Sequence, residues 1–543
     1  MSAVGSPIEA SGASAPKDLP TILADLHSRT RPWRQPFDLA SCAFSFASSV
    51  NSTPKLASDS PGIRQIAPAP SSKTARSPAN KIISDSIPGP GYDHELALLD
   101  GDAPDELAHE VVTAPLVTRD AYLFGGGLRS SIPQYGILGS IVSIHSQNAI
   151  DGHVDPRIYL NTNAPFSAVV CGVQGSGKSH TVGVLLESMM IPGDTRLGAL
   201  QKPFAGLVLH YGENGGSRPC EAAYQCSTSD KKIRPPIVKV YVSPSRIRTM
   251  TKVYGDVFGK KVEIIPLKIT DSELDAQAFL SMMCVSSGKE PPLYVQIILG
   301  MLRDIGENFS FMAFKKQLEE KKSDKEFNLA QLAGIKQRMS LLEAFLCSRR
   351  SVMPRFTKGQ VTIVDLTDPF IDPASASSIF EIVTRLFVRA EVKTGKVLVV
   401  DEAHKYLTMG SGSSDLTKTL LSIVRQQRHL GMRMILSTQE PTVIPSALLD
   451  LCTITIMHRF SSVGWFDHLS KHVSSEFTHE AFDTVVRLRT GQAIVLAPAG
   501  LGVFKKGGED DSKKRVANFG RRWLLVKTRR RLTKDGGASI LAI

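Results

Sequence analysis

The sequence predicts an α/β fold built on a parallel central sheet, because strand and helix patterns alternate over residues 166–503. Near-continuous apolar runs, typical of strands buried on both faces, occur at 167–171, 206–210, 237–242, 361–366, 397–400, 432–437, 453–458 and 492–496. Helical patterns lie between several of these runs, at Lys178–Met190, Ala374–Glu391 and Leu416–His429. This alternation predicts repeated strand–helix–strand units.

Two segments depart from this alternation. Residues 271–350 contain no good strand and carry four helical patterns, at 273–284, 292–307, 311–322 and 328–347, which predicts a helical insertion. Short apolar runs at Leu116–Phe124, Tyr135–His145 and Arg157–Asn161 predict strands of a small β module over residues 93–165. Residues 1–92 are rich in Ser, Pro and Ala and are expected to be a disordered arm.

Composition restricts the classes of protein to consider. No stretch approaches 18 consecutive apolar residues, so no transmembrane helix and no membrane partner are expected. The beginning of the chain lacks a secretion signal, and the seven scattered cysteines do not suggest a disulfide framework. An intracellular location, in the cytoplasm or nucleus, is therefore expected. The apolar patch at Trp33–Phe46 and its neighbouring arginines leave a docking motif or an organelle-targeting segment as alternatives.

The positive charge is concentrated in the tail formed by residues 504–543. Between Phe504 and Lys534, twelve residues are Lys or Arg and three are acidic, so this stretch contributes +9 to the net charge of +12. Such a segment suggests a polyanionic partner, for example duplex DNA. A solubilising segment or a nuclear-import signal explains the charge equally well.

A phosphate-binding loop is predicted directly after the strand at 167–171. Gly172-Val-Gln-Gly-Ser-Gly-Lys-Ser179 has the spacing G-x-x-x-x-G-K-[ST] and is followed by a helix. Gly172, Gly175, Ser176 and Gly177 are expected to turn backbone N–H groups towards ATP. Lys178 is expected to reach the β- and γ-phosphates, Ser179 to ligate Mg²⁺, and His180 to continue the nucleotide-binding segment.

An acidic pair ends the strand at 397–400. Asp401 is expected to hold Mg²⁺, and Glu402 to polarise the attacking water, which favours hydrolysis over binding alone. Asp401-Glu-Ala-His404 also spells the motif of DEAH-box RNA helicases. It lies 223 residues after Lys178, too far for those helicases, and no second RecA-like domain follows.

Later motifs resemble those of HerA/FtsK-type ATPases over about residues 116–503. The resemblance rests on Asp401-Glu-Ala-His-Lys-Tyr-Leu407, Val424-Arg-Gln-Gln-Arg-His-Leu-Gly-Met-Arg-Met-Ile-Leu-Ser-Thr-Gln439, Ile444-Pro-Ser-Ala-Leu-Leu449, Ile456-Met-His-Arg-Phe460 and Gly491-Gln-Ala-Ile-Val495. It implies a RecA/FtsK-like P-loop NTPase domain at 166–503.

The resemblance also assigns roles to individual residues. Gln439 is similar to the family's sensor residue, which contacts the γ-phosphate or the attacking water. Arg428 is similar to an arginine presented to the nucleotide of a neighbouring subunit, and Arg459 is a second candidate. Glu440 stands where the family often has arginine, so an arginine contact is not expected at that position.

Two functions of different classes follow from these observations. The first is an ATP-hydrolysing motor that forms a homo-oligomeric ring, a hexamer in the family, and acts on duplex DNA through its pore and basic tail. The second is a nucleotide-dependent switch or scaffold in a protein complex without translocation. Cys220 and Cys226 lie near His210 in the sequence, but their spacing is not that of a zinc knuckle, which disfavours a metal site.

Overall fold

A computed structural model provides the fold of the chain. It describes residues 106–124, 128, 130–146, 150–212, 218–283, 294–323, 327–347, 354–407, 414–472, 479–505 and 514–537. The predicted arm at 1–92 and the patch at Trp33–Phe46 lie outside these residues. In the described part of the chain, every helix is too short or too polar to span a bilayer.

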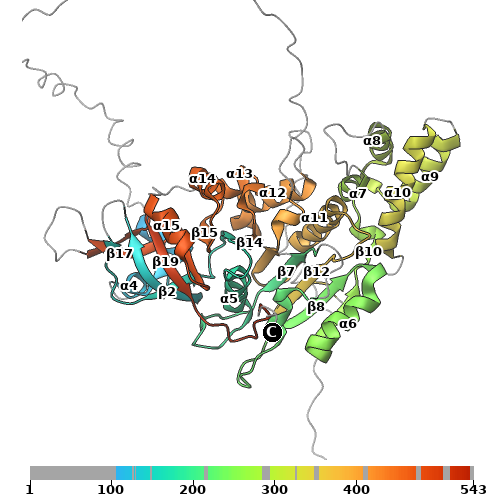
Figure 1. Cartoon of the computed structure of the whole chain (residues 1–543). Coiled ribbons are helices and arrows are strands. Elements are labelled where there is room, and N and C mark those ends of the chain that lie inside the picture. The colour runs from blue at the N-terminus through green and yellow to red at the C-terminus, as the bar shows by residue number, and fades with distance from the viewer. Residues whose placement is uncertain are drawn as a thin grey trace, which may run out of the picture. The chain divides into compact units, whose positions relative to one another are not determined.

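A parallel sheet forms the centre of the molecule (Figure 1). Its hydrogen-bonded pairs place eight strands in the order β9, β8, β12, β7, β13, β14, β5, β15. Their bounds are β5 (Ser167–Cys171), β7 (Ala205–His210), β8 (Ile237–Val242), β9 (Val262–Pro266), β12 (Gln360–Asp365), β13 (Lys396–Val400), β14 (Met432–Thr438) and β15 (Ile454–Met457). The predicted α/β fold is therefore confirmed.

The sheet continues beyond β15 through antiparallel neighbours. β16 (Gln492–Leu496) pairs with β15, β19 (Trp523–Thr528) with β16, β2 (Tyr135–His145) with β19, and β4 (Arg157–Asn161) with β2. β1 (Leu116–Thr118) follows β4, and β17 (Leu501–Lys505) and β18 (Lys514–Asn518) complete the edge. The short strands β3 (Ile150–Asp151) and β6 (Gly198–Ala199) both pair with β2. Elements of the N-terminal module and the C-terminal segment thus share one sheet.

Helices cover both faces of the parallel strands. Alternate side chains of β5 divide between two apolar cores: Ala168 and Val170 face α5 (Lys178–Met190) and α6 (Ile247–Phe258), whereas Val169 and Cys171 face the opposite core. That second core contains α11 (Pro373–Arg389), α12 (Asp415–Leu430) and α13 (Ser446–Asp450). The parallel strands are buried on both sides, which explains their continuous apolar sequences.

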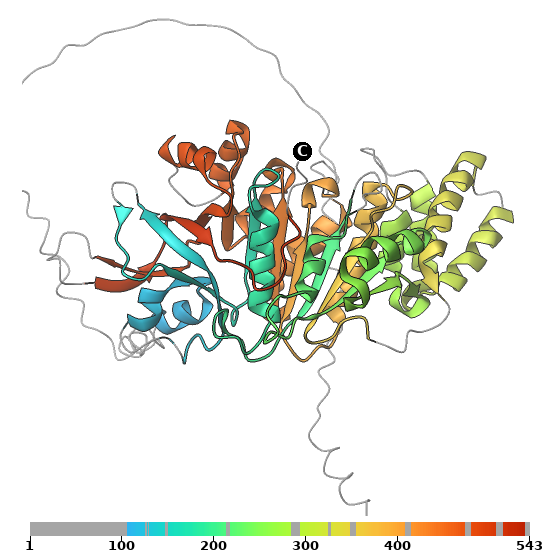
Figure 2. The same ribbon diagram turned by 60° about the horizontal axis from the view of Figure 1, so that its bottom comes forward.

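The remaining helices lie towards the ends of the sheet (Figure 2). Residues 271–350 contain α7 (Ala276–Met283), α8 (Tyr294–Ile305), α9 (Phe311–Ser323) and α10 (Leu329–Phe345), which extend the second core. The short strands β10 (Ile269–Thr270) and β11 (Leu346–Cys347) pair with each other at the base of these helices. α3 (Glu106–Thr113) lies beside the N-terminal strands, and α14 (Val463–His472) and α15 (His479–Arg487) precede β16.

The structure corrects two sequence-based expectations. The predicted strand at 116–124 ends at Thr118, because the Thr118 hydroxyl accepts a hydrogen bond from Ala121 N and starts α4 (Arg119–Leu123). The basic tail at 504–543 was expected to follow the ATPase domain, with a strand at Trp523–Val526 as one possibility, but from residue 514 onwards it belongs to the domain's own sheet. It forms β18 and β19 within the sheet, and residues 528–537, which we name the C-terminal strap, return to α5.

The C-terminal strap binds a buried carboxylate on the phosphate-loop helix. The side chain of Glu187 in α5 is fully buried, and its Oε2 lies 2.6 Å from Arg529 Nη1. Its Oε1 accepts hydrogen bonds from Leu532 N, Thr533 N and the Thr533 hydroxyl, at 3.0, 2.8 and 2.6 Å. Arg531, whose side chain is 1% exposed, lies 3.9 Å from the same oxygen and 2.8 Å from Glu221. These contacts compensate for burying the charges.

Glu187→Gln is expected to lower the free energy of unfolding by about 3 kcal/mol, because the buried Arg529 loses its counter-charge and Arg531 keeps only its pairing with Glu221 and Asp535. Denaturant unfolding followed by circular dichroism measures the change. Glu263→Gln is the matched control, since the side chain of Glu263 is 60% exposed beside Lys239 and its loss should cost about 0.5 kcal/mol or less. Equal losses in the two variants would contradict the stabilising role of the contacts between Glu187 and the C-terminal strap.

Candidate nucleotide site

Four parallel strands end at the same edge of the sheet. Cys171 of β5 pairs with Thr438 of β14, and Val400 of β13 pairs with Leu436 of β14 and with Leu209 of β7. The segments that follow these strands are therefore brought together. They carry the phosphate loop, Gln439, the acidic pair and His210. Ligands of open α/β sheets bind at this carboxyl edge.

The phosphate loop adopts a conformation that depends on glycine. Gly172, Gly175 and Gly177 have φ angles of 144°, 74° and 115°. A Cβ atom on Gly172 would lie 2.8 Å from Cβ of His458, so a side chain at this position would collide as well as strain the backbone. α5 begins at Lys178 without a side-chain cap, which leaves its first-turn N–H groups suited to an anion.

Lys178 lies under the loop and close to acidic side chains. It is 5% exposed, and its Nζ donates a hydrogen bond of 3.0 Å to Val173 O. Burial lowers the pKa of Lys178, and the negative charge of Glu402 opposes this effect. Because its ammonium group is hydrogen-bonded to the backbone of the phosphate loop, Lys178 is held near the position that a bound phosphate would occupy.

Glu402 and Gln439 form the central contact of the site. Gln439 Nε2 donates to Glu402 Oε2 at 2.8 Å, and His404 Nε2 lies 3.4 Å from the same oxygen. Glu402 has a φ of 51°, one of only two positive values among the described non-glycine residues. Such a backbone costs on the order of 1–3 kcal/mol and is tolerated where the surroundings fix it. The structure thus brings together two residues that the sequence analysis assigned to one site.

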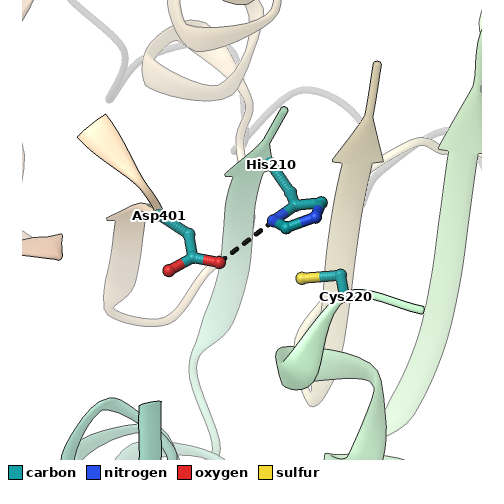
Figure 3. Close-up of side chains that lie close together, drawn as sticks. All are labelled: His210, Cys220 and Asp401. Carbon is teal, nitrogen blue, oxygen red and sulfur yellow. Dashed lines mark hydrogen bonds and ion pairs between the residues drawn. The ribbon is translucent and has the colours of Figure 1, made fainter. Parts of the chain in front are cut away.

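Asp401 is held by a histidine from the neighbouring strand (Figure 3). His210, the last residue of β7, places its Nδ1 3.0 Å from Asp401 Oδ2. Burial alone would raise the pKa of Asp401, but the hydrogen bond and charge of His210 hold it below its ordinary value. Burial likewise disfavours charge on His210, yet the neighbouring Cys220 and Asp401 raise its pKa well above the ordinary value. Asp401 is therefore ionised and oriented.

His458 supports the phosphate loop from below. It follows β15, is fully buried, and lies 2.9 Å from Gln492 O through Nδ1 and 2.9 Å from the Thr181 hydroxyl through Nε2. The Thr181 hydroxyl lies 3.1 Å from that of Thr528. Burial lowers the pKa of His458 to about 4, so the ring is neutral near pH 7. This network connects the loop helix to β16 and β19.

The other predicted site residues occupy different positions. Ser176 donates its hydroxyl to Val173 O at 2.7 Å, so its side chain stabilises the loop itself. The His180 side chain turns away from the loop: it lies 2.7 Å from Asp535 and 2.8 Å from Arg529 O, both in the strap. Only the backbone of His180 is therefore left for the nucleotide-binding role expected from the sequence.

Both candidate arginines are exposed. Arg428 lies in the last turn of α12, and Arg459 follows β15. Arg459 also contributes its carbonyl oxygen, which accepts a hydrogen bond of 3.0 Å from Val173 N in the phosphate loop. The guanidinium groups of both arginines are thus accessible at the surface, whereas the backbone of Arg459 has a structural role within the chain.

Several residues of the site were missed by sequence reasoning. His458 and His404 lie within motifs noted for other residues, and a histidine next to a strand end was the only available signal. The contact between His210 and Asp401 spans 191 residues of sequence, and that between His180 and Asp535 spans 355. Local patterns carry no information about contacts of this separation.

The donor set fits Mg²⁺ together with a nucleotide. Ser179 offers a hydroxyl in the first turn of α5, and Asp401 offers an oriented carboxylate whose pKa lies below the ordinary value. Mg²⁺ prefers oxygen ligands and commonly uses one or two protein groups plus phosphates and water. These two residues would hold the ion.

The fold and site define a P-loop ATPase with an additional strand, because β14 lies between the loop strand β5 and the acidic strand β13. Residues 317–502 match the family model described as zonular occludens toxin (Zot). This match, with the order of the motifs, supports the resemblance to HerA/FtsK-type ATPases, the class to which Zot belongs. No curated protein matches the chain at a significant level.

Three solved structures are similar to parts of the chain at 11% sequence identity. VirB4 of Thermoanaerobacter pseudethanolicus has a TM-score of 0.42, covering 73% of this chain and 97% of its own. The bacterial conjugative coupling protein TrwB has a TM-score of 0.35, covering 68% and 87%. The genome packaging NTPase B204 of Sulfolobus turreted icosahedral virus 2, bound to ATP-γS, has a TM-score of 0.26, covering 65% and 96%. With such low scores, the assignment rests on the site geometry and the Zot match.

The neutral His458 predicts a pH dependence of stability. The folded pKa of about 4 lies below the unfolded value of 6.5, so the unfolded chain binds the proton first as the pH falls. The free energy of unfolding should therefore fall between pH 6.5 and 4, with a contribution from His458 of up to about 3 kcal/mol. Denaturant titrations of the wild type and of His458→Gln should show a smaller pH slope for the variant. His429→Gln, at an exposed position, should keep the wild-type slope, and a slope unchanged in His458→Gln would contradict the prediction.

Proposed function

We propose that the chain hydrolyses Mg²⁺–ATP at this site and works as a ring-forming motor on duplex DNA. The contact between Glu402 and Gln439, beside Lys178, carries the proposal for hydrolysis. It places a carboxylate that can accept a proton next to an amide that can orient a water. Both side chains lie at the carboxyl edge of the sheet, where β5 ends and the phosphate loop begins.

Each residue has a distinct task in this proposal. The backbone of the loop from Gly172 to Gly177 binds the phosphates, and Lys178 neutralises charge on the β- and γ-phosphates. Ser179 and Asp401 would hold Mg²⁺, which supplies charge neutralisation on the phosphates when bound. Gln439 orients the attacking water, and Glu402 accepts its proton.

Ring assembly would complete the site. Arg428 is exposed on α12, so its guanidinium group can reach a nucleotide held by a neighbouring copy. An arginine supplied in trans stabilises the charge of the transition state and makes hydrolysis depend on assembly. The resemblance to HerA/FtsK-type ATPases favours a hexamer.

The basic C-terminal residues divide into two groups with respect to DNA. Arg522, Arg529 and Arg531 are engaged with Asp151, Glu187 and Glu221 within the chain, so they are not the polyanion contacts expected from the sequence. The exposed basic residues on and beyond β18 that remain for phosphate contact are Lys514, Arg515, Lys527, Arg530 and Lys534. The DNA contact proposed here uses this exposed group and is sensitive to salt.

Glu402→Gln is expected to lower kcat for ATP by at least about 100-fold, because the amide cannot accept the proton of the attacking water. ATP binding should persist, since the phosphate loop is unchanged. In the wild type, duplex DNA should increase the rate, and this stimulation should decline as salt rises. A phosphate-release assay with and without DNA, and equilibrium ATP binding, measure these quantities.

Glu440→Gln is the matched control, because Glu440 is exposed and its side chain bonds only locally to Thr442. It should retain the wild-type rate. Full activity in Glu402→Gln would contradict the proposed role of Glu402. ATP binding without any response to DNA at any salt concentration would instead favour a nucleotide-dependent switch.

Arg428→Ala is expected to reduce kcat by about 10³-fold while leaving the isolated subunit's ATP binding intact. Mixing Arg428→Ala with Lys178→Ala subunits should restore part of the activity, because some interfaces then combine an intact loop with an intact arginine. Arg425→Ala, one helical turn away and also exposed, is the control. Failure of complementation in rings that native mass spectrometry shows to be mixed would exclude a trans role for Arg428.

A further inference from the structure

Three side chains of different ligand chemistry meet beside the nucleotide site (Figure 3). They are His210 at the end of β7, Cys220 before the 3₁₀ helix η4 (Glu221–Cys226), and Asp401 after β13. One ring nitrogen, the thiol sulfur and one carboxylate oxygen all lie within 4.8 Å of one another. The sequence spacing of Cys220 and Cys226 disfavoured a metal site, but it is Asp401, not Cys226, that joins His210 and Cys220 in space.

We propose that His210, Cys220 and Asp401 form a binding site for a thiophilic divalent cation of the Zn²⁺ class. An imidazole, a thiolate and a carboxylate are all zinc ligands, whereas Mg²⁺ does not favour sulfur. Three protein ligands with water in the fourth position is the arrangement of an open zinc site. Tetrahedral coordination needs ligand atoms about 3.6 Å apart, given zinc bonds of about 2.1–2.3 Å. Side-chain rotations that move the atoms by about 1 Å would achieve this.

The surrounding structure holds the ligands in place. His210 pairs with Asp365 in the register of β7 and β12, so its backbone is fixed within the parallel sheet. Cys220 N donates a hydrogen bond of 3.0 Å to the Tyr254 hydroxyl, which donates in turn to Asp365 at 2.6 Å. Rigid elements that carry ligands reduce the entropy lost on binding an ion.

Two of the three proposed ligands are partly exposed to solvent. Cys220 is 1% exposed, but the side chains of His210 and Asp401 are 16% and 15% exposed. The sulfur thus lies at the closed end and the two other ligands at the open end. With the thiol buried and the nitrogen and oxygen donors partly exposed, a fourth coordination position remains for water.

Zinc occupancy would regulate hydrolysis, a consequence that rests on the function proposed above. Zinc and Mg²⁺–ATP would both use the carboxylate of Asp401, so we expect zinc to draw its negative charge away from Mg²⁺ and the two ions to compete. Zinc in the site should therefore inhibit ATP hydrolysis, and loss of the thiol should relieve the inhibition. Cys220 itself takes no part in hydrolysis, which makes it the informative position to change.

The test uses the full chain, treated with a chelator, reduced and desalted. Co²⁺, a spectroscopic substitute for Zn²⁺, should give a sulfur-to-cobalt charge-transfer band with one ion bound per chain, and Zn²⁺ should displace it. Cys220→Ser should weaken Co²⁺ binding at least about tenfold and remove the band. Cys226→Ser, a buried cysteine six residues further on, should keep both. A band absent from the wild type, or retained in Cys220→Ser, would overturn the proposal.

Two further measurements separate the site from the proposed function. X-ray absorption at the zinc edge of the wild type should show one sulfur among nitrogen and oxygen ligands, and a shell without sulfur would overturn the site even if Cys220→Ser fails to fold. In ATPase assays at fixed Mg²⁺, Zn²⁺ should inhibit the wild type at least about tenfold more strongly than Cys220→Ser, given the weakened binding. Cobalt binding without inhibition would support the ion site and contradict the role of Asp401 in hydrolysis.

Discussion

The insertion of β14 between β5 and β13 is the constraint on which the site depends. Neighbouring strands lie about 4.8 Å apart, so the phosphate loop and the acidic pair are separated by about 10 Å at the carboxyl edge. Lys178, at the start of α5, and the carboxylates after β13 thus lie on either side of the end of β14. The intervening strand ends in Thr438, and the next residue, Gln439, contacts Glu402 from within the gap. Strand order thus determines which side chains can meet.

The C-terminal strap gives this edge of the sheet a second support. Glu187 on α5 is neutralised by Arg529 and Arg531, which belong to the most basic part of the sequence. The strap also contacts His180, the residue directly after Ser179. The helix that begins at the phosphate loop is therefore held along its length by the end of the described chain. Charge that appears in the sequence as a polyanion-binding tail serves in part to stabilise the nucleotide domain.

Much of the fold could be predicted from local patterns. Continuous apolar strands, their alternation with amphipathic helices and the loop at Gly172–Ser179 all reflect short-range physical requirements, and the structure contains them. The strand expected at Leu116–Phe124 was partly wrong, because a single N-cap at Thr118 starts a helix within an apolar run. The pairing of β19 with β2 could not be predicted, since it joins segments nearly 400 residues apart.

The candidate site divides in the same way. Local motifs predict the chemical roles of four residues of the site, which are Lys178, Asp401, Glu402 and Gln439. His210 and His458 act through buried contacts with distant segments. From the sequence alone, each could equally be a core histidine that is hydrogen-bonded and has no role in the site. Their positions depend on which strands are neighbours, which is a property of the assembled sheet. The positions of Arg428 and Arg459 relative to a second subunit depend on an assembly that one chain does not contain.

Hydrogen–deuterium exchange with and without Mg²⁺–ATP tests the central claim most directly, because it locates the nucleotide on the chain. The proposed site predicts slower exchange at the N–H groups of Gly172–Ser179 when ATP binds, and at Glu402 and Gln439 across the gap. The distant helices α9 and α10 should exchange at unchanged rates. Unaltered exchange in Gly172–Ser179 under conditions where the protein hydrolyses ATP would contradict the account.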